Sequence, residues 1–276
     1  YGEKTWGRFM AFLFTWQTSI QAPLVVASGA IGFSQYFSYL YPLDEMSRKI
    51  MSGALVILIT IILYRRIGNI GKISVALWII TGGTILWVIV SGFTNFKMEN
   101  VWPWDMSKLD FTPAFFVALG QASLKSVYSF LGYYNVCHLG GEIQAPEKNI
   151  PKSIFYSITG ITFLYLGMQW MVTGVLGWQQ VASSDFVISK YFETIYGQTA
   201  AQIATALVLV IALSSLFSVL LGYSRVPYAA AKDGNFFSIF SKVHPKHHFP
   251  HISLLALAGV AFIFSLLFKM KEVITA

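Results

Sequence analysis

The stretch that decides the fold is S-V-Y-S-F-L-G-Y-Y-N-V-C-H-L-G-G-E-I-Q-A-P-E-K-N-I-P-K-S-I, from Ser126 to Ile154. It begins inside an apolar run and ends in a charged segment marked by proline. Ser129, Gly132 and Asn135 lie in the middle of the run, where a plain lipid-facing helix would carry Leu, Ile and Val. A break in a membrane helix frees backbone N–H and C=O groups, and it survives only where protein or water satisfies them. The stretch therefore predicts a broken helix that lines a wet cavity.

The composition of the chain is that of a protein embedded in lipid. Of its 276 residues, 55% are hydrophobic and 11% are charged, whereas a soluble domain carries about 25% charged residues. The formal net charge of +7 does not require nucleic acid as a partner, because membrane proteins accumulate Lys and Arg in cytoplasmic loops. Cys137 is the single cysteine, which excludes an intrachain disulfide. Because the sequence opens on Tyr1 and shows no signal peptide, we expect a piece of a longer protein.

Seven stretches with at most one charged residue predict membrane-spanning helices, since a hydrocarbon core of about 30 Å needs about 20 apolar residues. They are residues 9–40, 50–64, 73–96, 111–141, 153–184, 194–224 and 252–268. The expected fold class is therefore an all-α integral membrane protein. Pro23 is expected to kink the first span, and the apolar part of the fifth span ends near Trp178.

The loops between these spans carry more positive charge on one side than on the other. Eleven Lys and Arg residues fall on the side that holds the beginning of the chain, and seven fall on the opposite side. Because positive charge concentrates in cytoplasmic loops, the first side is predicted to be cytoplasmic. Trp102, Trp104 and Trp178 then lie where an aromatic belt is expected at the outer interface.

Three segments resemble the amino acid–polyamine–organocation permeases, in order and at suitable spacing over nearly the whole chain. Y-S-F-L-G-Y-Y-N at residues 128–135, followed by G-E-I-Q-A-P-E-K-N-I-P-K-S-I at residues 141–154, is similar to the sixth-helix signature of that family. S-R-V-P-Y-A-A-A-K-D-G-N-F-F at residues 224–237, with K-V-H-P-K-H-H-F-P-H at residues 242–251, resembles the segment that joins family helices eight and nine. Y-G-E-K-T-W-G-R-F-M-A-F-L-F-T-W at residues 1–16 resembles the start of family helix three.

The resemblance implies a LeuT-like inverted-repeat fold and secondary active transport of amino acids or related amines by alternating access. Residues 1–98 would hold the end of the first repeat, family helices three to five. Residues 99–276 would hold an incomplete second repeat, helices six to nine. Helices one, two and ten onward are expected in the full-length chain. The lengths agree, because a long span precedes a short one in spans one and two and again five helices later, and an odd offset inverts the second copy.

The resemblance also implies where the protein works and with what. We expect a multi-pass protein of the plasma membrane, which in a bacterium is the inner membrane. Its partners would be the lipid bilayer and a small amino acid or amine, without nucleic acid. No cofactor is expected. The coupling ion would be H⁺, with Na⁺ as the alternative.

The family comparison places the substrate site at the break. Tyr128 aligns with the aromatic gate that lies over bound substrate. Ser129, Phe130, Leu131 and Gly132 would form the unwound turn whose backbone groups bind the substrate's amine and carboxylate. The alternative for Tyr128 is an ordinary packed aromatic side chain, because 16% of the chain is aromatic.

Lys125 is the one charged residue deep inside a predicted span. It lies 12 residues after Pro113, or about 18 Å along a helix, which is too deep for easy snorkelling to the outer surface. It precedes Tyr128 by three residues, so both lie on one helix face. We expect Lys125 to face the outer vestibule and bind an anionic group or substitute for a cation. The alternative is a lysine that reaches vestibule water and has no role.

Three serines, Ser214, Ser215 and Ser218, match the helix in which sodium-coupled relatives place hydroxyl ligands. Oxygen ligands suit a hard cation, which makes these residues a candidate ion site. The favoured alternative is that small hydroxyl residues allow close packing of helices.

Glu142, Arg225 and Asp233 fall at cytoplasmic helix ends and are expected to form a cytoplasmic gate. The alternative is a set of ion pairs that only fixes the inner face. Four histidines cluster in residues 244–251, but no cysteine or paired carboxylate completes a ligand set, so no metal is expected.

Two other kinds of protein fit part of this pattern. One is a membrane amino-acid sensor that binds without transporting. The other is a seven-helix receptor, against which residues 252–268 lack the charged residue that a retinal-binding lysine would supply. An enzyme is not expected, because the sequence holds no H-E-x-x-H, no G-x-S-x-G and no pair of intramembrane aspartates.

Overall fold

The computed structural model describes residues 2–64, 70–102, 111–130, 132–138, 140, 143–247 and 249–268, and within these ranges its regular structure is entirely helical. The elements are α1 (Gly2–Leu40), α2 (Glu45–Leu63), α3 (Ile70–Gly92), α4 (Met98–Val101), α5 (Pro113–Phe130), α6 (Asn135–His138), α7 (Pro146–Leu176), α8 (Trp178–Ser183), α9 (Val187–Tyr196), α10 (Gln198–Tyr223), α11 (Arg225–Lys232), the 3₁₀ helix η3 (Ser238–Ser241) and α12 (His251–Leu267). The all-α prediction is confirmed.

Several of these helices have the length and apolar character needed to cross a membrane. Among the described residues five qualify, namely Thr5–Leu40, Glu45–Leu63, Ser74–Gly92, Pro146–Leu176 and Gln198–Lys232. The apolar α12 is shorter, with 17 residues. The fourth predicted span is divided between α5 and α6. The chain is thus an integral, multi-pass membrane protein.

Two helix features can be compared directly with the sequence expectations. The fifth span ends at Leu176, and Gly177, at φ 78°, caps it, which confirms the predicted end near Trp178. Pro23 lies inside α1, but the residue with non-helical backbone angles within α1 is Gly7, at φ 82° and ψ 173°. Glycine adopts this conformation readily because it has no Cβ. The start of α1 is therefore kinked at Gly7, and the kink at Pro23 stays a prediction.

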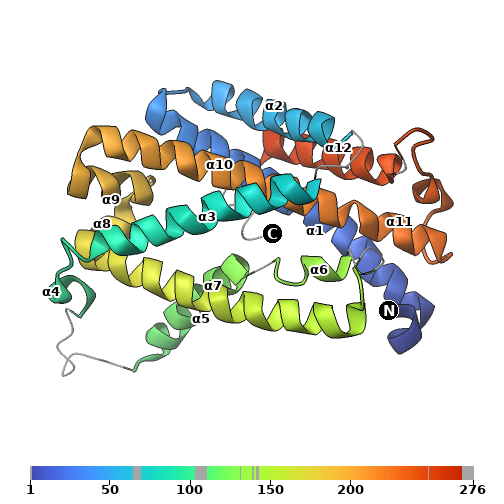
Figure 1. The fold of residues 1–276 in the computed structure, drawn as a ribbon, viewed down its shortest axis with the longest axis horizontal. Helices are drawn as coiled ribbons and strands as arrows, with labels where there is room; N and C mark the ends of the chain where they lie inside the picture. The colour runs from blue at the N-terminus through green and yellow to red at the C-terminus, as the bar shows by residue number, and fades with distance from the viewer. Residues whose placement is uncertain are drawn as a thin grey trace. The chain divides into compact units, whose positions relative to one another are not determined.

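The described chain divides into two compact units. The first comprises Tyr1–Thr81, Asn135–Ile143 and Thr205–Ala276. In it α1, α2 and α12 pack against one another, although α12 lies far from the other two in the sequence (Figure 1).

Small residues allow the helices of this first unit to approach closely. Ala27 and Ala30 of α1 are completely buried. A Cβ built on Gly53 of α2 would lie 2.8 Å from the ring of Phe262 in α12, so only glycine fits without repacking. The Ser52 hydroxyl donates a hydrogen bond to the Ser34 hydroxyl at 2.9 Å and links α2 to α1. Small side chains and interhelical hydrogen bonds are the usual means of helix association in lipid.

The second unit comprises Gly82–Tyr134 and Gln144–Ala204. In it the short helix α4 packs on α7. Asn100 of α4 donates its side-chain Nδ2–H to the Gly174 carbonyl at 2.9 Å. Tyr191 of α9 donates its hydroxyl to the Val88 carbonyl at 2.7 Å, and burial raises the pKa of the Tyr191 hydroxyl, which keeps it a donor.

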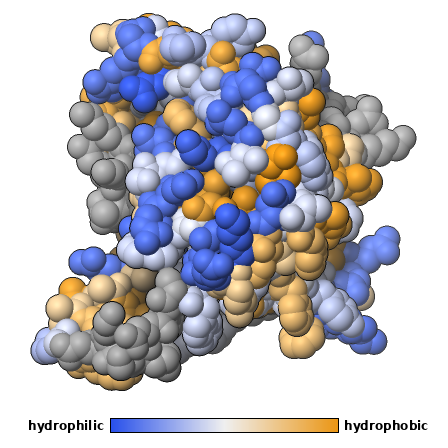
Figure 2. All heavy atoms as spheres, turned by 90° about the vertical axis from the view of Figure 1, so that its left-hand side faces the viewer, coloured by the Kyte–Doolittle hydropathy of each residue, from blue (hydrophilic) through white to orange (hydrophobic). Residues whose placement is uncertain are grey.

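The helices α8 and α9 form a polar segment between α7 and α10. In α9, Tyr191 and Phe192 are buried, whereas Lys190 and Glu193 are exposed. Hydrophilic side chains gather over these two helices in Figure 2. This two-sided pattern is typical of a helix that lies at a membrane surface with one face wet.

Candidate functional site

The fourth predicted span is broken where the sequence analysis placed the break. The helix α5 ends at Phe130, a turn occupies residues 132–134, and α6 begins at Asn135. Gly132 has φ 112°, a backbone conformation that residues with a side chain rarely adopt. The predicted break is therefore confirmed, and Gly132 is the residue that permits it.

The end of α5 exposes backbone groups that a continuous helix would satisfy. The last four carbonyls of a helix have no partner within the helix. One of these, the carbonyl of Ser129, accepts a hydrogen bond from the hydroxyl of Tyr165 in α7 at 3.1 Å. The rings of Phe130 and Tyr165 pack edge to face with centroids 5.3 Å apart. The second unit thus holds the broken end through one side chain of α7.

The predicted substrate residues lie together along one turn at this end of α5. Tyr128 and Phe130 are partly buried and Ser129 is exposed. The Ser129 hydroxyl donates to the Lys125 carbonyl at 3.0 Å. Leu131 lies outside the described residues. The turn therefore presents both aromatic surface and backbone polar groups, as the recognition of an amphiphilic small molecule requires.

Polar groups continue beyond the turn into α6. The side-chain Oδ1 of Asn135 is buried and has no hydrogen-bond partner among the described residues. A buried, unsatisfied amide oxygen costs free energy unless water or a ligand meets it. This is the kind of demand that a wet cavity or a bound donor satisfies. Asn135 was noted in the sequence for its polarity, but it was not predicted as a binding residue.

Lys125 is exposed and lies on α5, one turn before Tyr128. The spacing of three residues places the two side chains on neighbouring positions of one helix face. Its ability to bind an anionic group stays a prediction.

The three serines of the candidate ion site lie on α10. Ser214 is partly buried, whereas Ser215 and Ser218 are exposed. Ser214 and Ser218 are four residues apart and share one helix face. The ion site stays a prediction, and so does the packing role that is its alternative.

Two of the three residues of the predicted cytoplasmic gate, Arg225 and Asp233, lie at the ends of α11. Arg225 at its start donates from Nη1 to the Leu221 carbonyl at 2.8 Å. Asp233 caps the other end and is exposed. The eight residues of α11 separate the two positions by about 12 Å along the helix axis. Glu142 lies outside the described residues, so the gate as a whole stays a prediction.

A polar contact that the sequence did not reveal joins the two ends of the first unit. Glu3, in the first turn of α1, accepts a hydrogen bond from the Asn235 side-chain amide at 2.6 Å. Its other oxygen pairs with Arg8 Nε at 3.2 Å. The Asn235 hydrogen bond, and then the bond from Arg8, hold the pKa of Glu3 below its ordinary value. The contact joins residues that lie 232 positions apart, and no local pattern indicates such a pairing.

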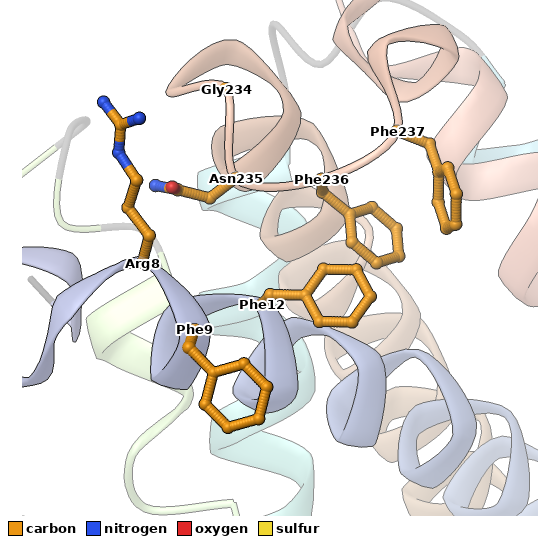
Figure 3. A pocket seen from close by; sticks show the side chains of 7 residues that line it. All are labelled: Arg8, Phe9, Phe12, Gly234, Asn235, Phe236 and Phe237. Atoms are coloured by element: carbon orange, nitrogen blue, oxygen red, sulfur yellow. The ribbon is translucent and has the colours of Figure 1, made fainter.

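Aromatic side chains continue this contact over a surface recess of about 380 Å³. The lining residues are Arg8, Phe9 and Phe12 of α1 and Gly234, Asn235, Phe236 and Phe237 of the segment after α11. Figure 3 shows the rings of Phe12 and Phe236 facing one another, and their centroids lie 5.9 Å apart. The Glu3 carboxylate and a small aromatic cluster therefore hold the start of α1 against the segment after α11. We call this contact the clasp.

In the histidine-rich loop, residues 244–251, the side chain of His244 makes structural contacts within the first unit. His244 Nδ1 accepts hydrogen bonds from the backbone N–H groups of Lys246 and His247, at 3.2 and 3.3 Å. The rings of Tyr64 and His244 pack edge to face with centroids 5.5 Å apart. In the part of the chain that the structure describes, no group of three or more His, Cys, Asp or Glu side chains is arranged to hold a metal ion.

Comparison with known proteins relates this sequence to a family of permeases. Residues 1–276 match the sequence model of a family described as amino acid permease. The branched-chain amino acid permease BcaP of Bacillus subtilis (strain 168) is 26% identical over 268 residues, which cover 90% of this chain and 56% of that protein.

Two further relatives from the same organism show how varied the group is. The methylthioribose transporter is 23% identical over 282 residues, covering 95% of this chain and 59% of that protein. The aspartate-proton symporter is 22% identical over 273 residues, covering 92% and 51%. The chain spans between one half and three fifths of the length of these three relatives.

Proposed function

Since the chain belongs to the amino acid permease family, we propose that the protein is a secondary active transporter that moves amino acids or related amines by alternating access around the break between α5 and α6. The family and its relatives are permeases and transporters rather than enzymes. The observation that carries the proposal is the broken helix, with Gly132 at φ 112° and the exposed Ser129 at its end. In secondary transporters such discontinuous helices form the substrate site near the middle of the bilayer.

The chemistry of the break suits a zwitterionic or cationic amine. The carbonyl end of α5 carries partial negative charge, which favours an ammonium group. Tyr128 and Phe130 supply the partly buried aromatic surface against which a side chain can pack. Lys125, one turn earlier, is the cation in this region that would attract a carboxylate.

We assign the remainder of the architecture on the same basis. The seven predicted spans form a LeuT-like inverted-repeat fold, with residues 1–98 completing a first repeat and residues 99–276 forming most of a second. The full-length chain supplies the rest of the site from helices outside this sequence, in agreement with the partial coverage of the relatives. We propose that the side rich in Lys and Arg faces the cytoplasm and that the protein belongs to the plasma membrane.

Protons are the proposed coupling ion. One relative is named an aspartate-proton symporter, and its match covers 92% of this chain. Ser214, Ser215 and Ser218 are the residues to test if uptake proves to depend on sodium.

The test is uptake by the full-length protein in proteoliposomes. Labelled L-leucine, L-aspartate, L-arginine and putrescine would be offered with and without an inward proton gradient. Concentrative uptake of one of these only under the gradient is the expected result. Uptake that merely equilibrates would replace proton coupling with exchange or facilitated transport. Binding of a compound in detergent without uptake under any ion gradient would replace the transporter with a membrane sensor.

A further inference from the structure

A tyrosine of α7 supplies a hydrogen bond to the end of α5 that α5 itself cannot make. In an unbroken helix the carbonyl of Ser129 would accept the N–H of Tyr133. That bond is lost because α5 ends at Phe130 and Gly132 turns the chain away. Tyr165 supplies the missing donor, with its hydroxyl 3.1 Å from the Ser129 oxygen.

The ring of Tyr165 fixes the direction of this hydrogen bond. It packs on Phe130 at 73° with a centroid distance of 5.3 Å. Tyr165 lies in the middle of the long helix α7, and it is partly buried. A side chain held at both its ring and its hydroxyl has little freedom, so the carbonyl that it contacts is also held in one direction.

We infer that Tyr165 is a positioning residue for amine recognition, which orients the Ser129 carbonyl toward the ammonium group of the substrate. The inference rests on the proposed function. A carbonyl oxygen has two lone pairs, and Tyr165 occupies one of them. Among the described residues Tyr165 is the donor recorded for this carbonyl, so its second lone pair, at the negative end of the α5 dipole, can accept an ammonium N–H.

This role separates Tyr165 from a tyrosine that only fills space. A packing residue contributes through its ring, which phenylalanine preserves. A positioning residue contributes through its hydroxyl, which phenylalanine lacks. The other tyrosine of α7, Tyr156, is 70% exposed, and its ring packs on its neighbour Phe155. Tyr156 therefore provides a matched control on the same helix.

The experiment compares Tyr165→Phe with Tyr156→Phe in the full-length protein. Kinetics of uptake would be measured with the member of the four-compound panel that the parent transports. We expect KM to rise roughly 2- to 12-fold in Tyr165→Phe, the equivalent of one neutral hydrogen bond. Vmax and the thermal midpoint in detergent are expected to match those of the parent, and Tyr156→Phe is expected to match it in every measurement.

Three results would overturn the inference. The first is an unchanged KM in Tyr165→Phe. The second is a rise in KM together with a lower thermal midpoint than that of the parent, which shows a structural role. The third is an equal rise in Tyr156→Phe, which shows a general effect of altering α7.

Hydrogen–deuterium exchange separates this inference from the proposed function. We expect the amides of residues 128–138 to exchange faster in Tyr165→Phe than in the parent, whether or not substrate is present. If the parent neither binds nor transports any panel member, the proposed function and the amine role fail together, although faster exchange would still show that Tyr165 holds the break. If transport is normal but neither exchange nor KM changes, the inference fails and the proposed function stands.

Discussion

Single residues at the break between α5 and α6, and at the contact between Glu3 and Asn235, have structural roles that their residue types alone do not indicate. Gly132 has a positive backbone φ, Asn135 has a buried side-chain oxygen without a partner among the described residues, and Glu3 binds a residue 232 positions along the chain. Each is an ordinary residue type whose role is set by where the chain places it.

Substitution of Gly132 by alanine tests the backbone requirement. We expect Gly132→Ala to destabilise the protein by about 1–3 kcal/mol, because a residue with a Cβ is strained at a positive φ, and to weaken substrate binding. The matched control is Gly120→Ala in α5, where a Cβ meets no atom within 4 Å. This control should be neutral or slightly stabilising, since alanine favours helix more than glycine. Thermal unfolding in detergent measures both, and equal behaviour of the two variants would contradict the requirement.

The clasp at Glu3 predicts a dependence of stability on pH. Because the pKa of Glu3 is lowered in the folded protein, its carboxylate adds stability above its unfolded pKa, and this is lost as the pH falls through the folded pKa. We therefore expect Glu3→Gln to have a lower thermal midpoint than the parent at neutral pH. The difference should disappear in acid, where the parent carboxylate is protonated.

The exposed Glu193 of α9 is the control for this titration. Glu193→Gln should follow the parent at both pH values. A constant difference between Glu3→Gln and the parent across the acidic range would show that the charge of Glu3 is not what holds the clasp.

At the scale of helices, the sequence predicted the features that depend on neighbouring residues and missed those that depend on contacts between distant residues. The break at Gly132 and the end of the fifth span near Trp178 follow from local residue types, and both were predicted. The short helices α4, α8 and α9 were not predicted, since tertiary contacts such as Asn100 with Gly174 stabilise them. The roles of Tyr165 and Glu3 were also missed, because a tyrosine in an apolar span and a glutamate in a first turn each fit many environments.

The end of α7 gives a prediction about packing between helices. A Cβ at Gly174 would collide with the ring of Phe96, which itself stacks on Trp170 with centroids 6.4 Å apart. We expect Gly174→Ala to destabilise the protein by about 1–3 kcal/mol, the usual cost of overpacking. Gly160→Ala on the same helix should not, because a Cβ there meets no atom within 4 Å. Thermal midpoints in detergent measure both variants. Equal midpoints would show that Phe96 does not pack against Gly174.

At the scale of the whole molecule, the distribution of positive charge predicts how the protein is oriented in the membrane. Eleven positive residues on one side against seven on the other predict that the beginning of α1 and the loop after α11 face the cytoplasm. The loop between α1 and α2 then faces outward.

Thiol labelling in intact cells tests the orientation. Met46→Cys and Lys242→Cys would be made in a background in which Cys137→Ala removes the one cysteine of this chain, with any others in the parent replaced as well. Both positions are exposed. A membrane-impermeant maleimide should modify Met46→Cys from outside and should modify Lys242→Cys only after permeabilisation. The reverse pattern would invert the topology.

The packing of α1, α2 and α12 has a consequence for how the protein is made. Translation proceeds from the beginning of the chain, so α1 and α2 enter the bilayer long before α12, which starts at His251. Until then the surface around Gly53 lacks its partner Phe262. The nascent protein therefore stays in the membrane with this helix face unfilled until α12 has been synthesised, and the insertion machinery or a membrane chaperone has a defined surface to shield during that time.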